Sequence, residues 1–313
     1  MTKQKKFNNI LIIDGLNAFI RSYSVDQSLT IDGEKCGGTV GFLNCLKSWV
    51  NKLNPDSIFI CWDGANGSLR RRNIFKDYKQ NRKPFLSRGK TDDDTKNKLW
   101  QLQTLVETLK FFPVCQIYID NCEADDVIYY LVNKINDSNK IIVSSDKDFY
   151  QLVDDETTIY TLSKKVILNK KAIKDDTGVF PVNFALYRSF IGDKSDNIEG
   201  VRGIGPKRVA KLFPFITEDK EYNMNDVTKF INENKESKKY TRFNDEIAKL
   251  ERNFELIKLD YNFLSLNQIS QIDNTISTFK PKLSILDIRK KLIKTKISIP
   301  YIDSVISPFR TIQ

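Results

Sequence analysis

Five groups of acidic residues follow or border short apolar runs, and this pattern constrains the fold more than any other feature. The runs at 9–13, 57–62, 114–119 and 140–144 have the length of strands. Segments of helical periodicity separate them, with apolar stripes over 42–53, 99–109 and 127–135. This alternation predicts an α/β protein with a mostly parallel central sheet flanked by helices. The acids are Asp14, Asp63, Glu123, Asp125, Asp126, Asp146, Asp148, Asp193 and Asp196.

Three of these acids are expected at one edge of the sheet. Asp14, Asp63 and Asp146 come at the ends of apolar runs, and open α/β sheets bind their ligands beyond the carboxyl ends of the strands. In a chain of formal net charge +10, so many carboxylates in one pocket are unfavourable unless hard cations neutralise them. Mg²⁺ and Mn²⁺ prefer carboxylate and water oxygens. We therefore predict a Mg²⁺ or Mn²⁺ phosphodiesterase site.

The local spacing within each group supports convergence. A helix that begins near Asn121 would point Glu123 and Asp126 the same way, with Asp125 bordering the apolar stripe. The fourth group, Asp146 and Asp148, would point to the same side if the chain is extended there. The fifth group, Asp193 and Asp196, would lie on one face if the chain is helical. Taken alone, any of these groups could instead cap a helix or a turn. Their joint occurrence at strand ends favours a single site.

Composition excludes several competing chemistries. The chain contains no histidine, so a Ser-His triad, an imidazole base and His-ligated zinc are all excluded. Its five cysteines show no CxxC spacing, and we expect reduced structural thiols in a cytoplasmic protein. The first apolar run is too short for a signal peptide or a membrane span. A pI near 9.1 favours polyanionic partners such as nucleic acid.

A basic stretch at 70–85 interleaves cations with aromatic residues and predicts a surface that follows a phosphate backbone. On a helix, Tyr78 and Arg82 would share a face with Lys79 beside them, close to Asp63. The alternative is a solvated basic helix whose aromatic side chains fill the core, and we expect Phe75 to be such a core residue. The cations of the stretch are Arg70, Arg71, Arg72, Lys76, Lys79, Arg82 and Lys83.

A second basic segment, at about 193–213, predicts a helix-hairpin-helix. Its Gly203-Ile204-Gly205 turn precedes a helix that begins at Pro206, and proline is favoured at that position. Backbone N–H groups at such a helix start, together with nearby cations, can grip a duplex backbone without reading bases. A lone Gly-x-Gly would more often be a simple turn. The candidate contacts are Arg202, Gly203, Gly205, Lys207, Arg208 and Lys211.

The motifs IIDGLNA, CWDG, YKQNR, EADD, SSDKDFYQL and GDKSDNIEGVRGIGPKRVA follow one another along the chain. With them the chain resembles the 5′-nuclease family over about 8–260, and its details are most similar to bacteriophage nucleases of the ribonuclease H type. The resemblance implies a PIN-like 5′-nuclease fold. Residues 1–180 would form the nuclease core, with a helical arch at about 70–112, and residues 181–313 a helical region that contains the helix-hairpin-helix.

The resemblance also implies a role for each matched residue. The first seven acids match those that hold catalytic metals, with Asp125 acting more through water, and Asp193 and Asp196 match the acids of the second metal. Lys79 and Arg82 match a basic pair that contacts the reacting phosphate, and Tyr78 matches a stacking or positioning residue beside them. The hairpin glycines match a site where family members hold a monovalent ion such as K⁺ through backbone carbonyls.

The implied activity is a 5′-3′ exonuclease and flap endonuclease that leaves 5′-phosphates. Its expected substrates are branched or nicked duplex DNA and RNA–DNA hybrids, including RNA primers in DNA replication or repair. We expect a monomer in the cytoplasm, in a bacterial host if the protein is phage-encoded. The region 220–313 would pack on the core or contact replication proteins. Two alternatives remain, a non-catalytic DNA-junction binding protein and a PIN-type ribonuclease acting on single-stranded RNA.

Overall fold

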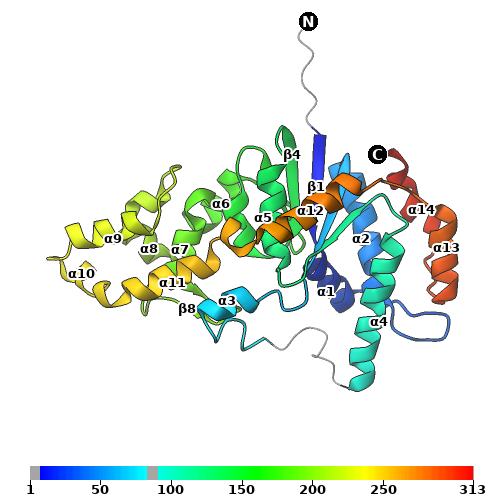
Figure 1. Ribbon diagram of the computed structural model, residues 1–313, viewed down its shortest axis with the longest axis horizontal. Helices are drawn as coiled ribbons and strands as arrows, with labels where there is room; N and C mark the ends of the chain where they lie inside the picture. The colour runs from blue at the N-terminus through cyan, green and yellow to red at the C-terminus, as the bar shows by residue number, and fades with distance from the viewer. Residues whose placement is uncertain (1–7, 83–90, 313) are drawn as a thin grey trace, which may run out of the picture.

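The computed structural model describes residues 8–82 and 91–312, and a six-stranded sheet lies at its centre (Figure 1). The strand order is β3-β2-β1-β4-β5-β6. The first five strands pair in parallel, and β6 runs antiparallel to β5, so the prediction of a mostly parallel sheet is confirmed. The strands are β1 (Asn8–Asp14), β2 (Ser57–Trp62), β3 (Cys115–Tyr118), β4 (Ser138–Ser144), β5 (Thr157–Thr161) and β6 (Ile167–Leu168).

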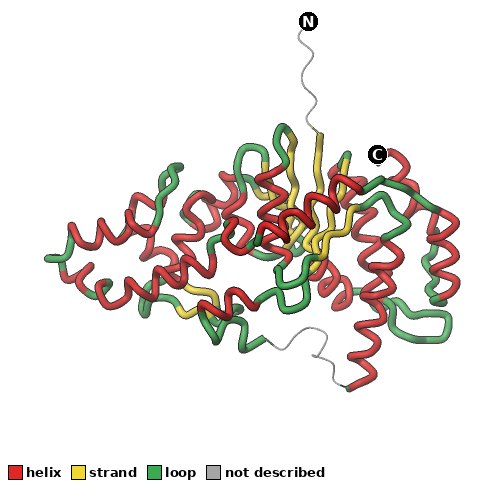
Figure 2. The backbone as a smooth tube through the Cα atoms, in the orientation of Figure 1, coloured by secondary structure: helices red, strands yellow, loops and turns green. Residues whose placement is uncertain are grey.

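Alternating residues of the strands face two separate hydrophobic layers. Ile10 and Ile12 belong to one buried cluster, whereas Leu11 and Ile13 belong to another on the opposite face. Successive side chains of a strand point to opposite faces, so a strand without polar residues must be covered on both sides. The continuous apolar runs in the sequence therefore encode a three-layer arrangement, with strands in the middle and helices on both sides (Figure 2).

One helical layer covers the Leu11 face and the other covers the Ile10 face. The Leu11 layer contains α1 (Gly15–Val25), α2 (Gly37–Leu53), α4 (Asp92–Leu109), α13 (Ile285–Lys294) and α14 (Ile302–Ile306). The Ile10 layer contains α5 (Ala124–Lys134), α6 (Lys170–Thr177) and α12 (Leu266–Thr278). The same buried cluster continues away from the sheet through α7 (Phe184–Ile191), α8 (Pro206–Leu212), α9 (Met224–Glu233) and α11 (Ile247–Ile257) (Figure 1).

The predicted apolar stripes are confirmed on α2 and α5 but only in part on α4. Leu105 and Leu109 of α4 are buried, as expected, whereas Leu99 is 42% exposed. The buried face of α4 also carries polar residues, including Gln101, whose side-chain oxygen accepts a hydrogen bond from the backbone N–H of Gly38 at 2.7 Å. The stripe is therefore rotated relative to the core, and part of it faces outward.

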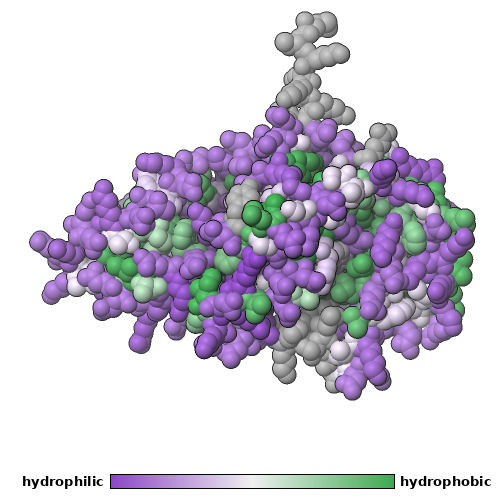
Figure 3. All heavy atoms as spheres, viewed as in Figure 1, coloured by the Kyte–Doolittle hydropathy of each residue, from purple (hydrophilic) through white to green (hydrophobic). Residues whose placement is uncertain are grey.

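The C-terminal part of the chain returns to the helices beside the central sheet. The ring of Phe309, in a 3-10 turn at Ser307–Thr311, packs edge-on against Phe112 with centroids 5.0 Å apart. The region 285–312 thus completes the layer that covers α2 and α4. No helix within the described ranges is both long and apolar enough to cross a membrane. The face in Figure 3 is mostly hydrophilic, with hydrophobic residues gathered in separate patches.

Candidate active site

The carboxyl ends of three neighbouring strands bring acids together. β1 lies between β2 and β4, so Asp14 at its end lies next to the ends of both neighbours. Asp14 accepts hydrogen bonds from the Ser144 hydroxyl at 2.9 Å and from the backbone N–H of Asn17 at 3.1 Å. Asp63 accepts one at 2.9 Å from the N–H of Ala124, the first residue of α5. Each of these two carboxylates thus accepts a hydrogen bond from a backbone N–H group at the start of a helix and also lies at the shared edge of the sheet.

Four acids at this edge have no basic partner. Within residues 8–82 and 91–312, Asp14, Asp63, Asp125 and Asp146 form no ion pair with lysine or arginine; we call them the unpaired acids. Burial and the nearby charges of Asp63 and Asp146 raise the pKa of Asp14 to about 7. Burial and Asp146 raise the pKa of Asp125 well above its usual value. Asp125 therefore belongs to the acidic centre rather than to the apolar stripe.

Two other acids are neutralised inside the protein by Arg71; we call Glu123 and Asp126 the paired acids. The Arg71 guanidinium lies 2.6 Å from Glu123 Oε2 and 2.7 Å from Asp126 Oδ1, and both Arg71 and Asp126 are 2% exposed. The Lys79 ammonium lies 2.5 Å from Glu123 Oε1. Burial alone would raise the pKa of Glu123, but Lys79 and Arg71 outweigh it and hold that pKa below its usual value.

The paired acids point together as predicted, although the local structure differs from the prediction. The helix begins at Ala124, with Glu123 as its N-cap, and not near Asn121. Asn121, two residues before the N-cap, has a φ of 55°, in the left-handed region, which separates the strand-end loop from the helix. The turn, rather than helical spacing, therefore sets the direction of Glu123.

A third group of acids lies across the edge. Carboxylate oxygens of Asp148, Asp193 and Asp196 all lie within 4.8 Å of one another. Arg188 forms an ion pair with Asp193, and its Nε lies 3.5 Å from Asp148 Oδ1. Burial would raise the pKa of Asp193, but Arg188 outweighs it and lowers that pKa. Arg82 Nη2 lies 2.5 Å from Asp196 Oδ1.

The last two groups, Asp146 with Asp148 and Asp193 with Asp196, converge without the backbone conformations considered for them, an extended chain for the first and a helix for the second. Asp193 ends the short strand β7 (Gly192–Asp193), and a turn connects it to β8 (Ile198–Glu199), so this group is not helical. Asp146 caps a 3-10 turn over Lys147–Leu152 by accepting a hydrogen bond from the Asp148 N–H at 2.9 Å, so the chain is not extended there. Turns bring these carboxylates together instead.

The acidic centre suits hard divalent cations. Asp148 Oδ1 is buried and has no hydrogen-bond partner. Burial and the charge of Asp146 raise the pKa of Asp148 to about 8. Arg188 Nε lies 3.5 Å from this oxygen and donates no hydrogen bond to it, so the setting stays unfavourable unless the oxygen gains a proton or a metal cation. The donors are carboxylate oxygens throughout, which is the donor type that Mg²⁺ and Mn²⁺ prefer.

The structure corrects the prediction for the basic stretch. Arg71 is buried against the paired acids, and Arg70 donates hydrogen bonds to the Phe263 carbonyl oxygen and, at 2.9 Å, to Gln268 Oε1. These two guanidiniums bind the protein itself and are not free to contact DNA. Arg72 and Lys76, in and just after α3 (Leu69–Ile74), remain exposed. Lys83 lies outside the described residues.

The YKQNR segment contacts the acids through turns rather than a helix. Lys79 has a φ of 54°, and residues 76–81 form successive turns, so the predicted helical face is wrong. Tyr78 is 3% exposed, and its hydroxyl lies 3.1 Å from Asp196 Oδ2 and 3.3 Å from Glu123 Oε2. Its ring is therefore enclosed and its hydroxyl lies between two acidic groups, which supports a positioning role rather than stacking on a base. Phe75 is partly buried against apolar neighbours, as the alternative predicted.

A cleft of about 820 Å³ joins the acids to the cations. The exposed or half-exposed cations in it can face a phosphate while the acids lie behind. Its charged lining residues are Asp63, Arg72, Lys79, Arg82, Glu123 and Lys194. Sequence reasoning missed Lys194 and Arg188. An arginine in the mostly apolar helix α7, five residues before Asp193, was the available signal for Arg188.

The predicted hairpin turn is confirmed. Gly203 has a φ of 72°, a conformation that glycine adopts without strain, and α8 begins at Pro206. Arg208 donates a hydrogen bond to the Gly203 carbonyl oxygen at 3.2 Å. The predicted contact residues are exposed, namely Arg202, Gly203, Gly205, Lys207, Arg208 and Lys211.

Known proteins are similar to this chain in sequence. A family model described as 5′-3′ exonuclease, N-terminal resolvase-like domain, matches residues 9–178. The 5′-3′ exonuclease of Buchnera aphidicola subsp. Schizaphis graminum is 34% identical over 216 residues, covering 67% of this chain and 70% of that protein. Flap endonuclease Xni of Pseudoalteromonas translucida is 30% identical over 215 residues, covering 65% of this chain and 77% of that protein.

A solved structure supports the fold over nearly the whole chain. A bacteriophage T5 flap endonuclease, in a pseudo-enzyme-product complex with DNA and metal ions, matches with a TM-score of 0.70 at 19% identity, covering 90% of this chain and 98% of that one. Fold and sequence together define a nuclease. The chain belongs to the 5′-3′ exonuclease family.

Proposed function

We propose that this nuclease is a divalent-metal-dependent 5′ nuclease that cuts DNA near a 5′ end or at the base of a 5′ flap and leaves 5′-phosphates. The observation that carries the proposal is the contrast, at one edge of the sheet, between the acids that have no basic partner and those that Arg71 neutralises. Asp14, Asp63 and Asp125 have raised pKa values, and cations that could face a phosphate line the adjoining cleft. The flap endonucleases among the relatives and solved structures support the choice of substrate.

The unpaired acids are the proposed ligands of one metal ion, and Asp148, Asp193 and Asp196 of a second. Mg²⁺, or Mn²⁺ in its place, would supply Lewis acidity that activates water and neutralises charge at the reacting phosphate. Glu123 is held by Arg71 and Lys79 and orients those cations. Asp126 is enclosed against Arg71, and its proposed role is to fix that guanidinium rather than to bind metal.

Lys79 and Arg82 are the proposed phosphate contacts. Both already lie at the edge of the cleft, where Lys79 pairs with Glu123 and Arg82 with Asp196. A bound phosphate offers each cation a second anionic partner, and preorganised cations stabilise charge that develops on non-bridging oxygens. Tyr78 bridges Glu123 and Asp196 and thereby holds the two cations in register.

Duplex DNA is the proposed partner of the hairpin and its exposed cations. A K⁺ ion bound through backbone carbonyls there would compete with Arg208 for the Gly203 oxygen. RNA in the 5′ strand, and hence primer removal during replication or repair, is proposed as a further substrate. The protein would act as a monomer, with replication proteins as further partners through the region 220–312.

Cleavage of two labelled substrates tests the proposal. A 5′-labelled flap duplex and a nicked RNA–DNA duplex are incubated with Mg²⁺ or with EDTA, and the products are mapped. We expect Mg²⁺-dependent release of the flap or of short 5′ products, with Asp63→Asn inactive but still able to bind. Binding without cleavage would support the junction-binding alternative. Equal cleavage by Asp63→Asn would overturn the proposed site.

A further inference from the structure

An apolar groove continues from the cleft along one side of α4. Its volume is about 870 Å³, and it shares the lining residues Leu16, Asp63 and Gly64 with the cleft. The two hollows therefore form one continuous trough that changes from charged to apolar at Asp63. The remaining lining residues of the groove are Trp62, Ala65, Leu102, Gln103, Val106, Glu107, Lys110 and Tyr118.

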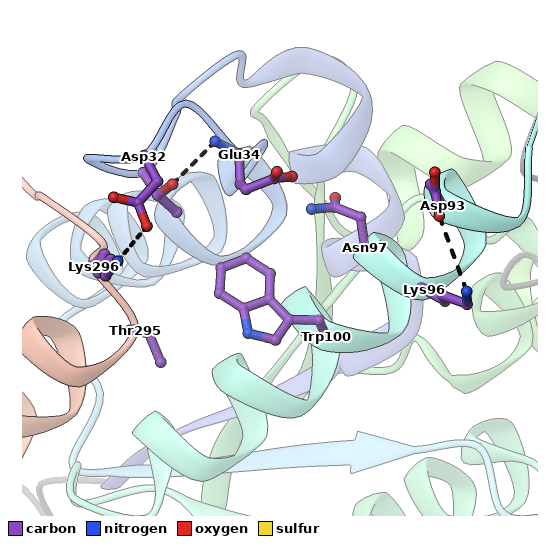
Figure 4. A pocket seen from close by; sticks show the side chains of 9 residues that line it. Asp32, Glu34, Asp93, Lys96, Asn97, Trp100, Thr295 and Lys296 are labelled. Carbon is purple, nitrogen blue, oxygen red and sulfur yellow. Dashed lines mark hydrogen bonds and ion pairs between the residues drawn. The ribbon is translucent and has the colours of Figure 1, made fainter.

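The apolar section follows from the rotated stripe of α4. Leu102 and Val106 lie one helical turn apart, and both are only partly buried. Another hollow beside α4, of about 480 Å³, has a different character (Figure 4). There Trp100 lies among charged side chains, and the Asp32 and Lys296 side chains form an ion pair at 2.5 Å. That hollow is neither apolar nor lined by any of the catalytic acids.

The groove can hold a nucleobase but not a run of phosphates. Among its described lining residues Lys110 is the one cation, and two acids, Asp63 and Glu107, line it as well. Because Lys291 already pairs with Glu107, a phosphate chain placed there would find Lys110 as its single cation in the groove and would lie beside the Asp63 carboxylate. The flat faces of a base, in contrast, match apolar and aromatic side chains, and every base offers such a face.

Tyr118 supplies an aromatic ring whose position is fixed. The side chain is 53% exposed at the rim of the groove. Its hydroxyl donates a hydrogen bond to Asp120 Oδ1 at 2.9 Å and accepts one from the Ala65 N–H at 3.0 Å. Ala65 follows Asp63 closely in the same loop, so the ring is tied to the backbone that carries the catalytic acid. A ring held in this way loses little freedom when a base stacks on it.

We propose that this groove binds one unpaired nucleobase of the cut strand, next to the scissile phosphate. The inference rests on the proposed function, because it places the base by the position of Asp63. Phosphates occupy the charged section of the trough while the neighbouring base leaves its helical stack and enters the apolar section. The groove thus draws the strand across the acidic edge independently of sequence.

Substrates with a single abasic nucleotide test the groove. The lesion is placed in turn at each of three positions on either side of the cleavage point, and kcat/KM is measured with Mg²⁺. A stacked base is worth about 1–3 kcal/mol, so we expect about a tenfold loss at one position and little change elsewhere. Uniform rates at every position would overturn the proposal.

Two groove variants connect that loss to the apolar wall. Leu102→Gln and, independently, Val106→Gln remove apolar surface without adding charge. We expect each to cut the intact substrate about tenfold more slowly and to lose most of its sensitivity to the abasic lesion. Leu286→Gln is the matched control, because Leu286 is 63% exposed on α13, outside the groove. An unchanged abasic penalty in both groove variants would contradict the proposal.

A binding measurement separates this inference from the proposed function. The adenine analogue 2-aminopurine is placed at the sensitive position, or at each position in turn, and its fluorescence is followed on binding in EDTA. If the base enters the groove, the 2-aminopurine fluorescence should change on binding at one position. This fluorescence change should be lost with Leu102→Gln and preserved with Leu286→Gln. No such change would overturn the groove even if Mg²⁺-dependent cleavage occurs. A protein that shows the change but never cuts would overturn the proposed function alone.

Discussion

The unpaired acids and the paired acids lie at the same edge of the sheet, yet their electrostatic settings are opposite. Burial and neighbouring carboxylates raise the pKa of Asp14 and of Asp125, whereas Lys79 and Arg71 overcome burial and lower that of Glu123. One half of the site is therefore neutralised by the chain itself. The other half is left for cations that the chain does not provide.

The largest expected effect comes from removing the internal counter-charge. Arg71→Ala leaves Glu123 and Asp126 without their shared partner, and breaking a buried pair from one side costs about 3–5 kcal/mol of unfolding free energy. Urea unfolding monitored by circular dichroism measures it. Arg72→Ala is the matched control on the next residue, and because Arg72 is exposed it should change stability by less than about 0.5 kcal/mol. Similar losses of unfolding free energy in Arg71→Ala and Arg72→Ala would contradict the division into paired and unpaired acids.

Neutralising an unpaired acid should affect activity and stability in opposite directions. We expect Asp14→Asn to lower kcat more than about 100-fold, because charge stabilisation by a bound metal contributes several kcal/mol. In EDTA the same variant should unfold at a higher urea concentration than the wild type, because one repelling buried charge is gone. A variant that loses both activity and stability would indicate that Asp14 is mainly a structural cap.

The pH dependence of stability in EDTA should follow the raised pKa values. The folded state holds the Asp14 proton up to about pH 7, whereas the unfolded state releases it near its ordinary value of 3.8. The folded state therefore binds more protons in this interval, and stability should fall as the pH rises through it, by at most about 4 kcal/mol from this group. Asp148, with a pKa of about 8, extends the fall to higher pH. Unfolding at pH 5 and pH 8 measures this difference, and an upward slope would contradict it.

The smallest effects are expected in the hairpin, far from the acidic contrast. Lys207→Ala and Lys211→Ala should each weaken DNA binding and lower the slope of log affinity against log salt by about 0.9, because each exposed cation contacts at most one phosphate. The rate at saturating substrate should remain unchanged. Fluorescence anisotropy at several salt concentrations tests this, and a changed kcat with an unchanged slope would place these lysines elsewhere in the mechanism.

Sequence predicted the elements that depend on local pattern. The strands ending at Asp14 and Trp62, the stripe of α2 and the glycine turn before α8 all have short-range signals that survive folding. It could not predict which acids are neutralised. That depends on Arg71, whose partners Glu123 and Asp126 lie 52 and 55 residues away along the chain. The enclosed position of Tyr78 and the outward rotation of α4 are likewise products of long-range packing.

The central claim is that the unpaired acids await divalent cations, and the metal dependence of thermal stability tests it most directly. The melting temperature is measured in EDTA and in a Mg²⁺ series for the wild type, for Asp14→Asn and for Asp93→Asn, an exposed acid outside the site. We predict that Mg²⁺ raises the melting temperature of the wild type and of Asp93→Asn by the same amount and has much less effect on Asp14→Asn. An equal rise in all three proteins, or none in the wild type, would contradict the account.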